Sequence, residues 1–268
     1  MYDLIEKSVL NIVDAVYARW PQPLPALAPL ATCKIISHRG QHDNLTVMEN
    51  TLTAFNTAVQ AGVWGLELDI RWTRDLKPVV FHDSNLMRIF QDPLEIRKTD
   101  RKTLINAFPL IPPLEAVLEQ YGRRAHLMVE LKAEHYPEPE RQASLLADCF
   151  SGLKPARDFH FLSLDTDMFR HVDFVPSEAL LPVSQLNFRR FSRLALSRGY
   201  AGVAGHYCFV NNRMAAQHKA RGQNVGVGYP CSRNSLFREI NRGVAWIFSN
   251  HACEMQAIIS EYLAKQTA

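Results

Sequence analysis

Short apolar runs alternate with amphipathic segments along most of this chain. Runs of roughly four to eight apolar residues predict buried strands, whereas apolar residues spaced three and four positions apart predict helices. The predicted strands are residues 33–37, 65–70, 78–82, 126–131, 159–163, 179–183, 201–205, 223–228 and 244–248. The predicted helices are residues 49–61, 112–121, 138–151, 166–172, 188–198, 211–221 and 233–241. Strands that alternate with helices in this way form a mainly parallel sheet.

This alternation indicates an α/β fold with a closed barrel of eight strands, and an open sheet is the alternative. One connection departs from the pattern, because only residues 71–77 separate the second predicted strand from the third. That segment is too short for a helical crossover between parallel strands. The two strands are therefore expected to form a hairpin that turns at Asp75-Leu76-Lys77. Such a hairpin would explain why nine runs are present where a barrel needs eight.

A long irregular stretch, residues 84–111, interrupts the alternation after the third predicted strand. Loops of this length inside compact domains usually have a function. We therefore expect residues 84–111 to form a cap insertion over an active site, and Phe90 and Phe108 are candidate lining residues.

The start of the chain and its composition predict a single globular protein. Residues 1–32 are expected to form an amphipathic helix over 3–19, which caps the fold, followed by a proline-rich connector. No Gly/Ser linker divides the chain, so residues 1–268 are predicted to be one domain. The five cysteines are scattered without a C-x-x-C pair, which predicts reduced thiols and a cytoplasmic location. No apolar run approaches the ~20 residues of a membrane-spanning helix.

Chemically versatile residues recur at the ends of the predicted strands. The groups are His38-Arg39-Gly40, Glu67-x-Asp69, His82-Asp83 and Glu130-x-Lys132. Such side chains are costly to bury unless they are paired or ligated, so four of these placements indicate one shared site. Glycine at position 40 would allow the chain to turn closely after the first histidine.

The three carboxylates of these groups suggest a metal site. Glu67 and Asp69 lie two positions apart on a strand and therefore point to the same face. Neighbouring carboxylates repel each other unless one is protonated or a cation lies between them. With Glu130 they would form an all-oxygen site, which suits Mg²⁺ or Ca²⁺ better than zinc. The alternative is a structural ion pair with Arg71 or Lys132.

The histidines and the cations suggest phosphodiester chemistry. His38 and His82 would suit a general base and a general acid that act across one phosphorus, because imidazole has an unperturbed pKa of about 6.5. The alternative for each is a core histidine with satisfied hydrogen bonds. The guanidinium of Arg39 offers a bidentate fork for phosphate oxygens, and Lys132 offers a point charge.

Over residues 34 to 133 the chain resembles the glycerophosphodiester phosphodiesterase family. The motifs that carry the resemblance are His38-Arg39-Gly40, Glu49-Asn50-Thr51-Leu52, Glu67-x-Asp69, Thr73-x-Asp75-x-x-Pro78-Val79-Val80-x-His82-Asp83, Leu86-x-Arg88, Ile111-Pro112-x-Leu114-Glu115 and Glu130-x-Lys132. The resemblance implies a distorted (β/α)8 TIM barrel and hydrolysis of glycerophosphodiesters to glycerol 3-phosphate and an alcohol.

The resemblance also implies roles for individual residues. It implies one divalent cation bound by Glu67, Asp69 and Glu130, an acid–base pair formed by His38 and His82, and Arg39 and Lys132 near the phosphate. Glu49 would have a supporting role only, and a cap at the start of helix 49–61 explains it almost as well.

The second half of the chain departs from the family pattern. Residues 225–230 replace a Trp-Thr-x-Asn segment, so that Gly228 stands where the family has an aromatic wall, and residues 248–251 replace Thr-Asp-x-Pro. This leaves room for a different or larger alcohol. Tyr229, Trp246 or His206 could compensate, although each is expected to be structural.

Positive charge is concentrated in the second half of the chain. Residues 185–242 contain ten Lys and Arg residues against Glu239 alone, a net charge of +9 in a chain of net charge +3. We interpret most of them as solvated helix faces, and part of this field could attract anionic phosphoesters.

The alternatives to a glycerophosphodiester hydrolase are a phospholipase D-like or lysophospholipase-type enzyme at a membrane surface, and a barrel that binds phosphodiesters without cutting them. Nucleic-acid binding is not expected, because no recognised module is present.

Overall fold

The computed structural model describes residue 13 and residues 15–267. Most of the predicted helix 3–19 lies outside these residues, although residues 15–19 are helical. The proline-rich connector contains the short helix α2 (Leu27–Thr32). No helix among the described residues is long and apolar enough to cross a membrane.

Eight parallel strands close into a barrel, and a ninth strand pairs with one of them from outside. The order is β1-β9-β8-β7-β6-β5-β4-β2-β3, and β1 also pairs with β2, which closes the ring. The closed barrel is therefore confirmed and the open sheet is wrong. The strands are β1 (Lys34–His38), β2 (Gly65–Trp72), β3 (Pro78–Val80), β4 (His126–Leu131), β5 (Phe159–Ser163), β6 (Leu180–Ser184), β7 (Gly202–His206), β8 (Asn224–Gly228) and β9 (Trp246–Ser249).

The predicted hairpin is the exception to parallel order. β2 and β3 are antiparallel, with Ile70 opposite Val80 and Trp72 opposite Pro78. Leu76 has a φ of 54°, so the chain reverses through a left-handed residue in the predicted turn. The hairpin places β3 beside β2 without adding a ninth member to the ring.

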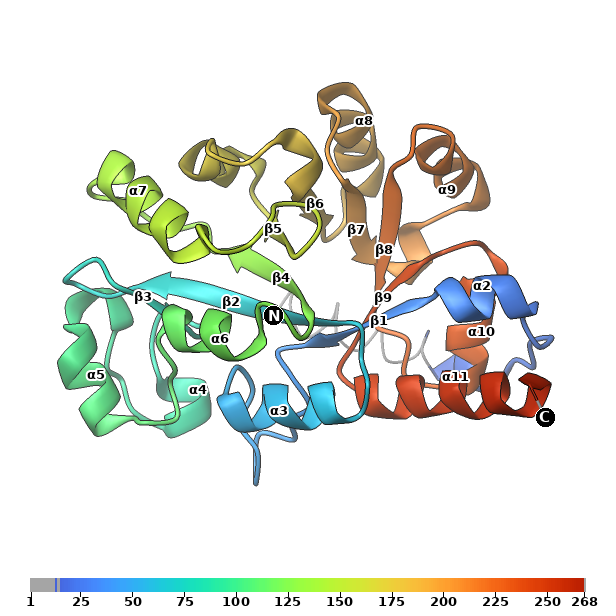
Figure 1. Ribbon diagram of the computed structural model, residues 1–268, viewed down its shortest axis with the longest axis horizontal. Helices are drawn as coiled ribbons and strands as arrows, with labels where there is room; N and C mark the ends of the chain where they lie inside the picture. Colours follow the sequence, from blue (N-terminus) through green and yellow to red (C-terminus); the bar gives the residue numbers. More distant parts are fainter. Residues whose placement is uncertain (1–12, 14, 268) are drawn as a thin grey trace.

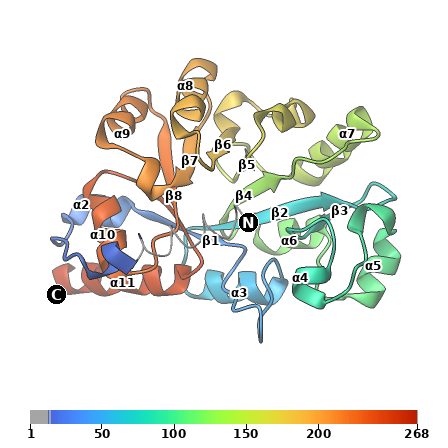
Figure 2. The ribbon, with the colours of Figure 1, turned by 180° about the vertical axis from the view of Figure 1, so that it is seen from behind.

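Helices surround the barrel on its outer side (Figures 1 and 2). They are α3 (Leu52–Gln60), α6 (Leu114–Tyr121), α7 (Pro139–Phe150), the 3₁₀ segments η2 (Thr166–Val172), η3 (Ser177–Ala179) and η4 (Tyr207–Phe209), α8 (Phe188–Arg198), α9 (Asn212–Lys219), α10 (Arg233–Asn241) and α11 (Ala252–Thr267). The sequence analysis did not predict α11. Its buried residues Ala252, Met255 and Ile259 nevertheless follow the spacing of three and four that marks a helix.

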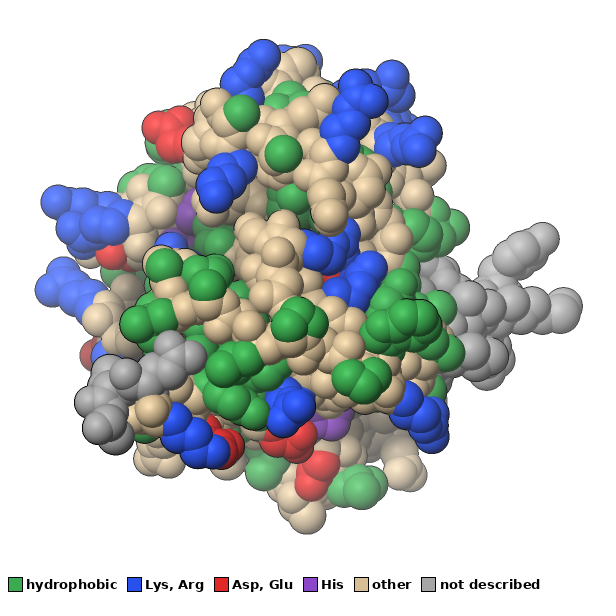
Figure 3. Space-filling view, turned by 90° about the vertical axis from the view of Figure 1, so that its right-hand side faces the viewer, with side chains coloured by type: hydrophobic (Ala, Val, Ile, Leu, Met, Phe, Trp, Pro, Cys, Tyr) green, Lys and Arg blue, Asp and Glu red, His purple; other side chains and the backbone are tan. Residues whose placement is uncertain are grey.

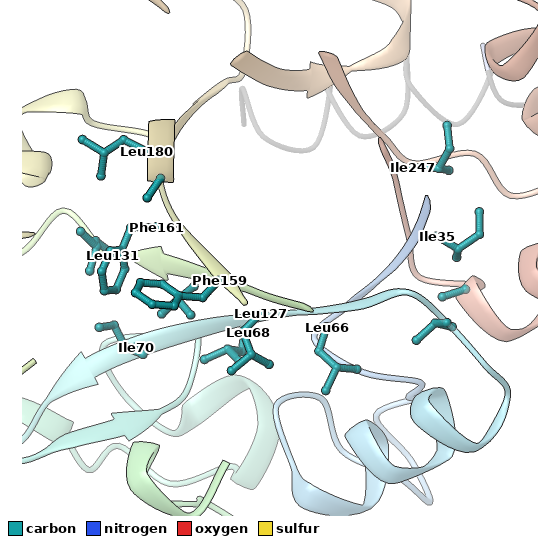
Figure 4. Close-up of a cluster of buried hydrophobic side chains, with 14 of the residues drawn as sticks. Ile35, Leu66, Leu68, Ile70, Leu127, Leu131, Phe159, Phe161, Leu180 and Ile247 are labelled. Atoms are coloured by element: carbon teal, nitrogen blue, oxygen red, sulfur yellow. The ribbon is translucent and has the colours of Figure 1, made fainter. Parts of the chain in front are cut away.

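Alternation along the strands separates two kinds of side chain. Leu66, Leu68 and Ile70 lie on the outer face of β2 and belong to the main apolar core beneath the helices (Figure 4). The residues between them, Glu67 and Asp69, must then point into the barrel, because successive strand residues face opposite sides. A second apolar cluster comes from the other inward positions; its members include Ile36, Met128, Leu162, Leu181, Trp246 and Phe248.

The insertion at residues 84–111 has its own small core. It contains α4 (Met87–Phe90), η1 (Ile96–Lys98) and α5 (Arg101–Ala107), so it is more regular than predicted. The ring of Phe90 lies 6.0 Å from that of Phe81 and 5.2 Å from that of Phe108. Phe90 and Phe108 therefore pack within the insertion, and their place in the lining of an active site stays a prediction.

Gly202, at the start of β7, allows a close contact with β8. Its φ is +149°, and a Cβ atom there would lie 1.7 Å from the carbonyl oxygen of Asn224. We predict that Gly202→Ala lowers the free energy of unfolding by more than about 3 kcal/mol, because the overlap would force the two strands apart. Gly152→Ala is the matched control, since a Cβ there meets no atom within 4 Å. Chemical denaturation of both variants checks this, and equal stabilities would contradict it.

Candidate active site

The predicted site residues meet at the carboxyl ends of neighbouring strands. His38 ends β1 and lies opposite Glu67 of β2, and Asp69 of β2 lies opposite Glu130 of β4. His82 follows β3 and is brought to the same end by the hairpin. Parallel strands place their carboxyl ends at one rim of the barrel, which explains why residues up to 92 positions apart in sequence come together here.

Three carboxylates form the centre of the site. Glu67, Asp69 and Glu130 are all buried, and each offers an oxygen within 4.8 Å of the others. Burial raises the pKa of Glu67 well above its usual value, and the neighbouring Asp69 and Glu130 raise it further. Burial also raises the pKa of Glu130. The pKa of Asp69 remains below its usual range, because Lys132 and Arg39 outweigh the effect of its burial.

Two cations lie against these carboxylates. Lys132 Nζ is 2.6 Å from Asp69 Oδ1 and 2.6 Å from Glu130 Oε1. Arg39 Nε is 3.2 Å from Asp69 Oδ2. The ion pair of these carboxylates with Lys132, which the sequence analysis gave as the alternative to a metal site, is therefore present. It leaves one carboxylate charge in excess, because two cations face three carboxylates.

The donor set fits a hard divalent cation. The ligand atoms are carboxylate oxygens, which Mg²⁺ and Ca²⁺ prefer. Asp69 Oδ1 is buried and has no hydrogen-bond partner of good geometry, although it contacts Lys132 as an ion pair. Asp69 and Glu130 also raise the pKa of Glu67, and a bound cation would relieve this repulsion between buried carboxylates.

His38 is held as a neutral ring in one orientation. Its Nδ1 lies 2.6 Å from Asn250 Oδ1, and an amide oxygen can only accept, so the proton is on Nδ1. Its Nε2 faces Glu67 Oε2 at 3.8 Å. Burial and the neighbouring Arg39 lower the pKa of His38 to about 3. The ring of Tyr229 packs against it at 4.8 Å.

His82 has a charged partner instead. Its Nδ1 lies 2.6 Å from Asp83 Oδ1. Arg88 donates a hydrogen bond to the other oxygen of Asp83 at 2.6 Å. The pKa of Asp83 is held below its usual range, because the contacts with His82 and Arg88 outweigh its partial burial. The backbone is also fixed, since Arg71 donates two hydrogen bonds to the carbonyl oxygen of His82 at 3.0 and 2.8 Å.

Glu49 supports the site rather than capping a helix. Helix α3 begins at Leu52, and its cap is Thr51, whose side chain accepts a hydrogen bond from the backbone N–H of Ala54. The buried carboxylate of Glu49 accepts hydrogen bonds from Arg39 Nη1 at 3.0 Å and from Arg88 Nη2 at 2.6 Å. The capping interpretation is therefore wrong, because a nearer hydroxyl performs that role.

The structure adds residues that the sequence analysis did not single out. Asn50 Nδ2 donates to Asp69 Oδ2 at 2.8 Å, and Arg88 links Glu49 to Asp83. Both lie within the quoted motifs, so a signal was present. Asn250 follows β9 at the same rim, within the segment 248–251 that departs from the family pattern, but its contact with His38 was not predicted.

The three candidates for a replacement aromatic wall differ in position. Tyr229 lies at the site, against His38. Trp246 begins β9 at the opposite end of the barrel and stacks near Trp64, at 6.3 Å. His206 packs against Tyr207 at 4.5 Å. The structural interpretation therefore suits Trp246 and His206, whereas Tyr229 contacts a proposed catalytic residue.

The raised pKa of Glu67 predicts an unusual pH dependence of stability. The folded protein retains a proton on Glu67 that the unfolded chain releases near the usual glutamate pKa of about 4.5, so without divalent ions the contribution of Glu67 to stability should fall as pH rises above that value. Glu67→Gln removes the buried charge and should raise the melting temperature at pH 8, by about 2–4 °C for each kcal/mol relieved.

Glu49→Gln is the control, because the ion pairs lower the pKa of Glu49 to about 2 and its charge is stabilising. This variant should have a lower melting temperature at pH 8. Calorimetry in chelator measures both variants, and a Glu67→Gln protein that melts below the wild type would contradict the prediction.

Comparison with known proteins supports one family. A model of the glycerophosphoryl diester phosphodiesterase family matches residues 38–157. The chain is 31% identical over 210 residues to the "Putative glycerophosphodiester phosphodiesterase YhdW" of Bacillus subtilis, covering 71% of this chain and 83% of that protein. It is 29% identical over 245 residues to a glycerophosphodiester phosphodiesterase of the same organism, covering 81% and 83%.

Solved structures share the fold. A glycerophosphodiester phosphodiesterase from Thermotoga maritima has a TM-score of 0.71 at 21% identity, covering 84% of this chain and 98% of that one. An Oleispira antarctica phosphodiesterase in complex with the product sn-glycerol-3-phosphate has a TM-score of 0.70 at 23% identity, covering 85% and 96%. The sequence identity across most of both chains, together with the matched family model, shows that this chain belongs to the glycerophosphodiester phosphodiesterase family.

Proposed function

We propose that this protein is a metal-dependent enzyme that hydrolyses glycerophosphodiesters to glycerol 3-phosphate and an alcohol. The observation that carries the proposal is the unequal environment of two histidines beside one carboxylate cluster. His38 has a neutral amide partner, and His82 has a carboxylate partner. A related Oleispira antarctica structure contains sn-glycerol-3-phosphate, which is consistent with this product.

Glu67, Asp69 and Glu130 would hold one divalent cation, Mg²⁺ or Ca²⁺. When bound, such a cation supplies Lewis-acid polarisation of the phosphate oxygens. Arg39 and Lys132 would add positive charge on the same side. Arg39 is already oriented by Glu49 and Asp69, so little conformational entropy remains to be lost when it binds a phosphate oxygen.

His38 suits the general base. Its Nδ1–H is held by Asn250, which leaves the lone pair of Nε2 free to accept a proton from the nucleophile. A ring with a lowered pKa is unprotonated at neutral pH, as a base must be before the reaction. The nucleophile can be water or a neighbouring hydroxyl of the substrate, since Nε2 could deprotonate either.

His82 suits the general acid. Its Nδ1 is bonded to the carboxylate of Asp83, so Nε2 is the nitrogen that remains to pass a proton to the leaving alkoxide. Arg88 keeps Asp83 ionised, and Arg71 fixes the backbone at His82. In this mechanism the proton gained at one ring is matched by the proton released from the other, and the next turnover requires their exchange with solvent.

Removal of divalent ions should abolish activity. We predict that a chelator lowers the release of glycerol 3-phosphate from glycerophosphocholine by about 10²-fold or more, and that Mg²⁺ or Ca²⁺ restores it. A panel that includes glycerophosphoethanolamine and a lysophospholipid would identify the preferred alcohol. Full activity in chelator would refute metal dependence, and binding of these compounds without product release would indicate a barrel that does not catalyse.

Loss of either histidine should slow the chemical step. His38→Ala or His82→Ala should lower kcat ~10²–10⁴-fold while the melting temperature changes little. His135→Ala is a suitable control, because His135 is exposed and belongs to neither pair. Turnover by either alanine variant at the wild-type rate would remove the acid–base assignment.

A further inference from the structure

The large exposed apolar side chains form two main groups, one in the segment before β1 and one at the end of the barrel that carries the proposed site. Beyond the segment before β1, they occur chiefly in the loops that follow the carboxyl ends of strands, the end that carries the proposed site. These residues are Leu45 after β1, Met87 after β3, Leu164 after β5, Leu186 after β6, Phe209 after β7 and Tyr229 after β8. We call this set the apolar rim. Outside these two groups, Leu110 between α5 and α6 and Phe174 are the comparable residues in the described part of the chain.

Two side chains of the apolar rim are mostly exposed to solvent. Leu45 is 83% exposed and Leu186 is 62% exposed. Single exposed apolar residues are common on protein surfaces and need no explanation. Six of them lie in the loops around one site, however, and exposed apolar groups that gather around a site indicate a surface that contacts something apolar.

Unpaired positive charge adjoins the apolar rim. Residues 179–238 contain no Asp or Glu. Arg189, Arg190 and Arg193 are exposed on the first turns of α8, directly after Leu186, and Arg213 is exposed on the first turn of α9. None of the four forms an ion pair or a hydrogen bond with another described side chain. Figure 3 shows Lys and Arg side chains gathered over the upper part of the molecule, where α8 and α9 lie.

A hollow lies where the charge and the apolar rim meet. It has a volume of about 370 Å³ and lies between η2 and α8. Leu164, Leu186 and Phe191 give it apolar walls, and Arg190 lies at its edge. Asp165 and Asp167 line the side formed by η2. An apolar group could enter this hollow while its anionic neighbour contacts Arg190.

We propose that this end of the barrel docks on an anionic lipid surface, with the arginines of α8 against headgroups and the apolar rim in the interfacial layer. Basic side chains beside exposed apolar ones are the combination that binds such surfaces. A nucleic acid would be attracted by the same charge, but it offers no apolar layer for Leu186 or Leu45. Docking would place the mouth of the proposed site against the lipid headgroups.

Vesicle sedimentation tests the proposal without any turnover, so its outcome is separate from that of the proposed enzymatic activity. The full chain should sediment with vesicles of equal parts phosphatidylcholine and phosphatidylglycerol, and much less with phosphatidylcholine alone. Raising the ionic strength from about 0.05 M to about 0.5 M should weaken binding, because salt screens the arginines. A wild-type protein that stays in the supernatant with anionic vesicles at low salt would overturn the proposal.

Two charge-matched triple variants locate the surface. Arg189→Gln/Arg190→Gln/Arg193→Gln should lower the partition coefficient about a hundredfold, at about fivefold for each arginine near the membrane. Arg123→Gln/Lys154→Gln/Arg221→Gln removes the same charge from loops at the amino ends of the strands and should leave it nearly unchanged. Equal losses in the two triples would overturn the docking surface in favour of a general charge effect.

The apolar rim is tested by a single substitution. Leu186→Ser should lower partitioning by about tenfold and make the remaining binding more sensitive to salt, because the apolar contribution is lost. Thermal melting confirms that each variant is folded, and all substituted side chains are exposed. Retention of the wild type on duplex DNA but not on anionic vesicles would replace the membrane by a nucleic acid, and an unchanged Leu186→Ser would overturn the apolar contact.

Discussion

The mutual repulsion of three buried carboxylates is the constraint around which the rest of the site is arranged. Glu67, Asp69 and Glu130 come from two adjacent strands, and their positions follow from the strand register. Two of them have raised pKa values because charge is costly at that depth. Lys132 and Arg39 reduce the cost without removing it. The barrel therefore maintains a cluster of buried carboxylates that is unfavourable for its own stability and favourable for a cation.

The second layer of contacts gives chemically similar groups different properties. An amide beside one imidazole and a carboxylate beside the other distinguish two rings that the sequence presents alike. Glu49 contacts both Arg39 and Arg88, and it thereby couples the loop after β1 to the insertion. The two imidazoles are therefore distinguished by their partners rather than by their own chemistry.

Much of this arrangement could be predicted from the sequence, because the strand signal and the motif residues are local. All nine strands were placed to within about two residues, since each is a compact apolar run. The insertion helices were missed because each is shorter than the window that reveals helical spacing. The pairing of His38 with Asn250 joins residues 212 positions apart, and the link from Arg88 to Glu49 spans 39. Contacts of that kind depend on barrel closure, which no local pattern encodes.

Strand β3 lies outside the closed ring, and the segment that follows it has an apolar cluster of its own. Barrel closure consequently places no demand on the length or composition of that segment. Relatives could lengthen, shorten or replace it during evolution at little cost to folding, provided that one arginine still reaches the loop after β1. Diversification of substrate range in this family would then be expected to concentrate there, while the ring of eight strands changes slowly.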